Sequence, residues 1–276
     1  MRTVADRAEL LPLAWARIAL AAVVIIRTTS LVRLIDPGIG TEVDGLLGWP
    51  HPGSFRAAWL GIVLPDDVVK LLCAIRTLGA VSLLAGYRPL PAGIVTGVAG
   101  YAVMLQDVFG FTFTQHLLFV GSVVIGLTDC AAVVAVRTER AIAPKTSFYL
   151  AWTFVTSVYF WAAICKLRRD WVDGRTLGLF YEEGKLRGTL ADALLSSDTR
   201  RALAATVILV TELAVVPLLW SRRTRWAGLA LAFSLHVVIE QVARPDVFGW
   251  AMIALLLSFV PISTTAPAAQ GGTQIA

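Results

Sequence analysis

Charge is scarce in this sequence, and its scarcity narrows the class of protein. Only 16% of the 276 residues are charged, whereas 57% are hydrophobic, and the mean hydropathy is +0.73. Soluble globular domains have about 25% charged residues. A chain this apolar is typical of bilayer proteins, in which helices satisfy their backbone polar groups internally. We therefore predict an all-α integral membrane protein.

Cysteine and histidine are also few, which argues against a disulfide framework or a metal centre. The three cysteines, Cys73, Cys130 and Cys165, stand singly in apolar segments without CxxC spacing. We interpret them as buried, reduced thiols. His236 and Glu240 share one helix face, but a metal site needs at least one more converging ligand. No metal is expected.

A basic stripe with interleaved aromatic residues is absent, so the net charge of +5 does not predict nucleic acid as a partner. The basic residues lie between apolar segments, as membrane topology and lipid headgroups require. Counting eight helices places the basic short loops on one side: Arg88, Arg137, Arg140, Lys145, Arg222, Arg223 and Arg225. We predict a multi-pass protein of the bacterial cell membrane with a cytoplasmic N-terminus and membrane lipids around it.

Apolar windows of about 20 residues, enough to cross a bilayer, recur along the chain. We predict a polytopic bundle of about eight transmembrane helices, near residues 13–34, 67–86, 90–109, 114–136, 147–167, 201–220, 226–243 and 247–261. The connections 36–66 and 168–200 predict interfacial, amphipathic elements. Residues 1–262 then form a single transmembrane domain, and residues 263–276 a disordered C-terminal tail.

Titratable side chains inside membrane spans are costly, so they mark candidate functional positions. With this topology most of the candidates fall in the outer leaflet, although nothing in their order along the chain forces this. Asp107, His116 and Lys166 lie at the outer ends of their helices. His236 and Glu240 lie in the middle to outer half of theirs, and Glu212 lies near mid-depth. The shared depth predicts one site, and Trp161 and Trp171 are candidates for lining it.

Each candidate has a structural interpretation beside the functional one. Lys166, at the end of an apolar helix, is either a neutral general base or a snorkelling anchor beside Arg168 and Arg169. His116 either serves the site or bonds a neighbouring backbone. The i, i+4 spacing of His236 and Glu240 predicts a buried pair in which the carboxylate fixes the imidazole tautomer. Trp161 either lines a pocket for a planar or isoprenoid ligand or packs in the core.

The segment around Lys166 resembles a known family. Tyr159-Phe160, Lys166-Leu167 and Trp171-Val172-Asp173-Gly174 are similar to the signature of the vitamin K-dependent gamma-glutamyl carboxylases, within the horizontally transferred transmembrane (HTTM) domain group. Glu212 through Trp250 gives a second match, with a short basic loop, a Leu-His pair and a Phe-Gly-Trp segment. Gln115-His116 gives a third, where the carboxylases have Asn-His.

The resemblance implies a reaction and a role for Lys166. In the carboxylases the matching lysine deprotonates a quinol, which then reacts with O2. The strongly basic oxygen species removes a proton from a glutamate side chain, CO2 adds to the carbanion, and the quinone leaves as its epoxide. The implied cofactors are a reduced, vitamin K-like quinone, O2 and CO2. Such a carboxylation reaction belongs to the lyase class. His116 would lie near the quinol oxygens, and His236 in the wall of the site.

Two departures limit the resemblance. The carboxylases carry a large lumenal domain for their protein substrate, whereas this sequence ends soon after the last predicted helix. Cys165 also stands where the carboxylases have a second lysine. We therefore expect a small lipidic or isoprenoid substrate and no propeptide-bearing protein substrate. The leading hypothesis is a membrane enzyme with Lys166 as general base in O2-dependent oxygenation or epoxidation, with or without carboxylation.

Two other functions stay open. In a terpenoid or meroterpenoid cyclase, a protonated Asp107, Glu212 or Glu240 would start cyclisation and aromatic rings would stabilise cations. The sequence has no Asp-rich diphosphate motif, which disfavours cyclases that ionise a diphosphate. In a non-catalytic carrier or scaffold the same residues would relay protons or hold helices together. The lack of internal repeats argues against a transporter built from inverted repeats.

Overall fold

The computed structural model describes residues 9–29, 43–44, 49–50, 64–106, 113–138, 141–142, 144–243 and 248–262. These residues are helical apart from turns and one short antiparallel pair, in which β1 (Val43–Asp44) lies beside β2 (Trp49–Pro50). The all-helical class is therefore confirmed. The predicted tail, and most of the 36–66 connection, lie outside the described residues.

Each of the eight predicted apolar windows overlaps a described helix, and three further short helices lie in the 168–200 connection. The helices are α2 (Leu11–Thr28), α4 (Asp66–Ala85), α5 (Pro89–Met104), α6 (Phe113–Gly126), α7 (Pro144–Lys166), α8 (Arg169–Val172), α9 (Arg175–Glu182), α10 (Thr189–Leu195), α11 (Asp198–Trp220), α12 (Arg225–Val242), α13 (Phe248–Leu256) and the 3-10 helix η1 (Leu257–Phe259).

Four of these helices are long and apolar enough to cross a membrane, namely α2, α4, α7 and α11. Helix α5, residues 115–126 of α6 and residues 248–259 are apolar but shorter. The structure thus supports a helical membrane protein with four candidate spans, and the count of eight stays a prediction.

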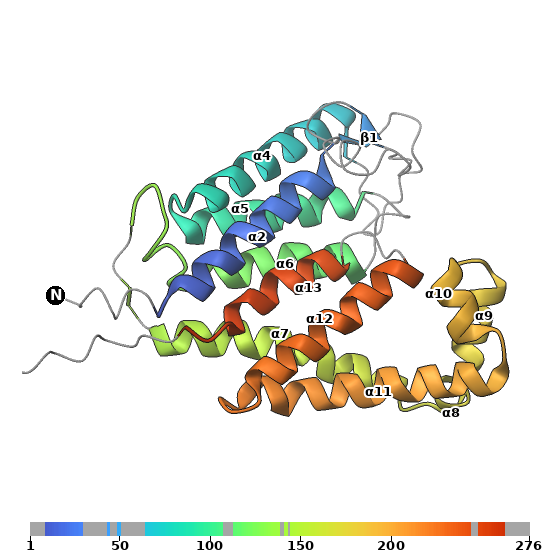
Figure 1. Ribbon diagram of the computed structural model, residues 1–276. Coiled ribbons are helices and arrows are strands. Elements are labelled where there is room, and N and C mark those ends of the chain that lie inside the picture. Colours follow the sequence, from blue (N-terminus) through green and yellow to red (C-terminus); the bar gives the residue numbers. More distant parts are fainter. Residues whose placement is uncertain are drawn as a thin grey trace, which may run out of the picture.

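The helices form one bundle, with α4 and α5 on one side of α2 and with α7 and α11 at the opposite edge (Figure 1). The main apolar core joins α2, α6, α7, α11, α12 and α13 through side chains such as Leu20, Leu118, Val155, Val215 and Met252. The connection 168–200 forms α8, α9 and α10. These short helices pack on α11, and Leu177 and Leu195 are buried there with Val242.

A buried arginine joins α2 to the end of α4. Arg17 is fully buried, and its Nη1 donates to the backbone oxygens of Leu83 and Leu84 at 2.6 and 2.8 Å. Its Nη2 donates to the oxygen of Val134. Carbonyl groups at the end of a helix have no partner within that helix. Arg17 therefore satisfies the C-terminal carbonyls of α4 and ties α2, α4 and the segment after α6 together.

The Arg17→Leu substitution should lower the free energy of unfolding by about 3 kcal/mol, because buried hydrogen bonds to a charged group would be lost without replacement. Thermal unfolding in detergent measures the change. Arg222→Leu, at an exposed position between α11 and α12, is the control and should leave the midpoint nearly unchanged. Equal midpoints for Arg17→Leu and the wild type would show that these bonds contribute little.

Candidate functional site

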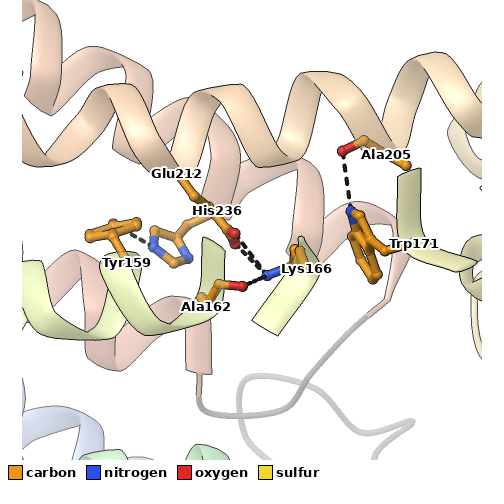
Figure 2. A network of polar contacts seen from close by, with 7 residues as sticks. All are labelled: Tyr159, Ala162, Lys166, Trp171, Ala205, Glu212 and His236. Carbon is orange, nitrogen blue, oxygen red and sulfur yellow. Dashed lines mark hydrogen bonds and ion pairs between the residues drawn. The ribbon is translucent and has the colours of Figure 1, made fainter. Parts of the chain in front are cut away.

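Lys166 is the last residue of α7, and its side chain reaches α11. Its Nζ lies 2.7 and 2.8 Å from the two carboxylate oxygens of Glu212, and it also donates to the oxygen of Ala162 at 3.3 Å (Figure 2). The Lys166 side chain is 19% exposed and that of Glu212 only 7%. The ammonium group is thus bound inside the helix bundle, whereas a snorkelling anchor would extend away from it.

The buried Lys166–Glu212 ion pair is costly to form and costly to break. Removing two charges from water takes several kcal/mol per ion, which the mutual attraction repays only in good geometry. Contacts to both carboxylate oxygens provide that geometry. A purely stabilising role is a weak explanation for such a pair, because apolar residues of similar size at the same positions often stabilise a protein as much as the ion pair does.

The Trp171-Val172-Asp173-Gly174 segment places an aromatic ring beside the lysine. Trp171 Nε1 donates to the oxygen of Ala205 at 3.2 Å, and Lys166 Nζ lies 5.2 Å from the centroid of the Trp171 ring. A cation at that distance from an indole is attracted to the ring. The Trp171 side chain thereby bridges the ends of α7 and α11.

The backbone conformation at position 174 explains why this segment ends in glycine. The φ of Gly174 is +76°, and a Cβ there would lie 2.5 Å from the backbone nitrogen of Ala202. Only glycine accepts both the left-handed conformation and the close approach. Asp173 is paired with Arg175 at 3.1 Å and with Arg169 at 3.4 Å. The turn brings α9 against α11 and so fixes the position of Trp171.

Tyr159 and His236 form a second buried pair next to the first. The Tyr159 hydroxyl lies 2.7 Å from His236 Nε2, and the two side chains are almost fully buried. Figure 2 shows Tyr159 and His236 to the left of the Lys166–Glu212 contact, with Tyr159 on the same helix as Lys166. Among the described residues His236 Nδ1 has no hydrogen-bond partner. The His236 ring also packs against Phe248, edge to face, at 5.4 Å.

The predicted pairing of His236 with Glu240 is wrong. Glu240 Oε1 accepts a hydrogen bond from the backbone N–H of Gly249 at 3.0 Å, at the start of α13. The free N–H groups of a helix N-terminus attract a carboxylate, and a shared helix face does not ensure a contact. His236 instead binds Tyr159 of α7.

The remaining candidates are distributed as follows. His116 lies on α6, where its Nδ1 is 3.1 Å from the hydroxyl of Tyr101. Trp161 is 62% exposed on α7. Asp107 lies outside the described residues. Sequence reasoning missed Tyr159 as a partner of His236, although it lies in the family-like segment, and it did not pair Glu212 with Lys166.

A cavity of about 780 Å³ joins several of these residues. Its walls come from α6 to α13, and most are apolar. The polar or reactive side chains among its lining residues are His116, Ser157, Cys165, Lys166, Thr176 and Glu212. Trp161 and Trp171 also line it, whereas His236 and Glu240 are not among the described lining residues. Its size and its few polar groups are typical of a site for a small, largely apolar molecule.

A metal centre is not formed by the part of the chain that the structure describes. No three His, Cys, Asp or Glu side chains come together there in an arrangement that could hold an ion. The chemistry that the described site offers is therefore that of an amine, a carboxylate, an imidazole and aromatic rings around an apolar cavity.

Comparison with known proteins identifies the family to which the chain is similar. A family model described as HTTM domain matches residues 12–263, which is most of the chain. No curated protein and no solved structure matches.

Proposed function

The chain belongs to the HTTM domain family, and on that premise we propose a membrane enzyme whose Lys166 is the general base toward a reduced quinone or related isoprenoid substrate. The observation that carries the proposal is the Lys166–Glu212 pair in the wall of an apolar cavity. The substrate enters from the bilayer, and the site faces the outer leaflet of a bacterial cell membrane with the N-terminus in the cytoplasm.

The pair supplies a route to a neutral amine. An ammonium group has no lone pair and cannot accept a proton. Transfer of one proton from Lys166 to Glu212 cancels both charges, and a desolvated setting favours that exchange because it disfavours charged forms. The amine then accepts the proton of a quinol hydroxyl. The O–H bond breaks, an N–H bond forms, and an anionic quinolate remains beside the Lys166 ammonium.

The quinolate is the species that reacts with O2 in the proposed reaction. One oxygen atom enters the ring as an epoxide and the other leaves as water, so that quinol and O2 give quinone epoxide and water. In the coupled form, the basic oxygen intermediate removes a proton from a small second substrate, and CO2 adds to the carbanion. Trp171 stabilises the ammonium product through its ring, an interaction worth about 0.5–2 kcal/mol.

The contacts of Glu212 and Glu240 favour this reaction over a terpenoid cyclisation started by either of them, whereas Asp107 lies outside the described residues. A cyclase needs a carboxylic acid whose proton is free for the substrate. Glu212 instead accepts from Lys166 at both oxygens, and Glu240 accepts from the Gly249 N–H. A carrier or scaffold would use the same contacts without any chemical change.

Purified protein in lipid nanodiscs tests the proposal. Reduced menaquinone is added, and oxygen uptake is followed with an electrode while products are extracted for mass spectrometry. We expect uptake above the rate of autoxidation and formation of the quinone epoxide. Product formation without O2 would favour a cyclase, and binding of the quinone without any product would favour a carrier.

A further inference from the structure

An apolar groove lies between α12 and α13, and it shares no described lining residue with the cavity at Lys166. The groove has a volume of about 350 Å³. Its described lining residues are all apolar, namely Trp226, Leu229, Ala230, Phe233, Ile253, Leu256, Leu257 and Val260. Those on α12 recur at i, i+3, i+4 and i+7, so they form one helix face of about 10 Å in length.

One end of the groove, its mouth, lies where α12 begins and η1 ends. Trp152 of α7 joins these two points, because the Arg225 guanidinium lies 4.2 Å from the centroid of its ring and Phe259 stacks on it at 5.2 Å. Trp152 Nε1 also donates to the oxygen of Ser258 at 2.9 Å. Figure 1 shows the start of α12 and the end of α13 at the end of the bundle where α7 begins. The groove therefore extends from this end toward the middle of α12 and α13.

Two arginines at the mouth have no partner among the described residues. Residues 221–224 connect α11 to α12, and Arg222 and Arg223 are exposed in this turn, within four residues of Trp226. Neither side chain forms an ion pair or a hydrogen bond with the part of the chain that the structure describes. Arg225 differs, because it is buried and its Nε donates to the oxygen of Leu219 at 3.0 Å. Arg225 thus holds the turn on the bundle, whereas Arg222 and Arg223 leave two positive charges at the mouth.

Exposed aromatic rings at the same end indicate the level of the lipid headgroups. Trp226 is exposed at the mouth, and the exposed rings of Tyr149 and Trp220 stack on each other with centroids 6.0 Å apart. Trp and Tyr are enriched at both membrane–water interfaces, where their rings lie among the headgroups. Arg222 and Arg223 are then at the level of the lipid phosphates, and the groove extends from them to the level of the acyl chains.

We propose that this groove binds one anionic phospholipid, with its phosphate group at Arg222 and Arg223 and an acyl chain between α12 and α13. Guanidinium groups bind phosphate oxygens through paired N–H donors. Basic pockets between membrane helices bind anionic headgroups in this way. A zwitterionic lipid brings a positive charge of its own to the two arginines, so charge complementarity selects the anionic lipid.

The lipid joins the α11–α12 turn to the end of α13. It thereby stabilises the packing of α12, which carries His236, against α13, which begins at Phe248. A ligand that binds only the folded protein raises its stability by mass action. The inference uses no residue of the cavity at Lys166, so it stands or falls independently of the proposed function.

Native mass spectrometry during lipid titration measures the binding. Full-length protein, freed of lipid in a nonionic detergent, receives phosphatidylglycerol or phosphatidylcholine with the same acyl chains. We expect one phosphatidylglycerol to bind at a much lower concentration than phosphatidylcholine. Each basic residue near the lipid surface contributes a factor of about five to affinity for an anionic lipid. Replacing Arg222 and Arg223 together by glutamine should therefore weaken phosphatidylglycerol binding about twentyfold and leave phosphatidylcholine binding unchanged.

A matched double variant controls for the loss of charge. Arg88 and Arg137 are also exposed, and they lie near the end of α4, where the N–H of Val136 donates to the oxygen of Ala85 at 2.8 Å. Replacing these two by glutamine removes the same charge away from the groove. The affinity for phosphatidylglycerol should change by less than about twofold, because salt screens distant charges.

A second pair of variants tests the place of the acyl chain. Ala230→Phe fills the groove, and Ala227→Phe is its control on the same helix, because Ala227 is exposed but not among the described lining residues. Ala230→Phe should weaken phosphatidylglycerol binding about tenfold or more, and Ala227→Phe should stay within about twofold of the wild type. If Ala230→Phe does not fold, Ala230→Leu should give a smaller shift in the same direction.

Four results would overturn the proposal. Equal affinity for the two lipids would mean that the groove does not select a headgroup. Equal weakening by the two double arginine variants would indicate a diffuse positive surface. Displacement of the lipid by an equal concentration of soluble glycerol 3-phosphate would identify the phosphate alone as the ligand. A wild-type dimer that Ala230→Phe disrupts would show that a second copy of the chain occupies the groove.

Discussion

Lys166→Ala should lower the turnover of a reduced quinone by about a thousandfold, within the range of about 10²–10⁴ typical of general acid–base catalysis. The substitution removes the amine that accepts the quinol proton. The kcat measured in nanodiscs should fall, while the folded variant should still bind the oxidised quinone, because the apolar lining of the cavity is unchanged. Lys70→Ala is the control, since Lys70 is 46% exposed on α4 and should not affect turnover.

Lys166→Arg distinguishes a base from an anchor. A guanidinium group can keep the ion pair with Glu212, but it stays protonated in proteins and cannot serve as a base. We expect this variant to fold like the wild type and to be as inactive as Lys166→Ala. Turnover near the wild-type rate in Lys166→Arg would mean that residue 166 only supplies a positive charge.

Glu212→Ala should lower the free energy of unfolding by about 3–5 kcal/mol, because it leaves the Lys166 charge buried without its partner. The side chains of Lys166 and Glu212 are 19% and 7% exposed, so water can solvate the unpaired Lys166 charge only in part. Thermal or denaturant unfolding in detergent measures the change. Turnover should also be lost, since the carboxylate no longer accepts a proton from Lys166.

A double variant separates stability from catalysis at this pair. Replacing Lys166 and Glu212 together by methionine removes both charges and keeps most of the side-chain volume. Such exchanges of buried ion pairs are often neutral or stabilising. We expect the double variant to recover most of the stability lost in Glu212→Ala and to remain inactive. A double variant no more stable than Glu212→Ala would contradict the assignment of that loss to an unpaired charge.

The position of Lys166 at the end of a long helix could be predicted from the sequence, but its pairing with Glu212 could not. The apolar run before Lys166 places it at the end of a long helix, and α7 ends at that residue. Glu212 lies 46 residues away, and only the packing of α11 on α7 brings the two together. The same holds for His236, whose contact with Tyr159 also joins two helices.

Predictions from residue spacing within one helix were wrong where another helix offered a better hydrogen-bond partner. The spacing of His236 and Glu240 permits a contact, yet the start of α13 attracts the Glu240 carboxylate. Apolar composition also overestimated helix length. The window 114–136 is apolar, but α6 ends at Gly126 and the chain turns from there, where Asp129 Oδ1 accepts from the N–H of Ile142. Amino-acid composition indicates how apolar a segment is, but it does not indicate where a helix ends within that segment.

The Trp-Val-Asp-Gly segment was identified from its resemblance alone, and the structure supplies its physical reason. The positive φ of Gly174 and its close approach to α11 set the turn, which holds Trp171 beside Lys166. Nothing in the local sequence predicts that approach, because it depends on residues of α11.

Isotopically labelled oxygen gas tests the central claim most directly. Nanodiscs with the wild type or Lys166→Ala receive reduced menaquinone under labelled O2, and extracted lipids are analysed by mass spectrometry. The account predicts a quinone epoxide whose epoxide oxygen carries the label in the wild type, and only the background of autoxidation in Lys166→Ala. Labelled epoxide in equal amount from both proteins would contradict the role of Lys166 as the base.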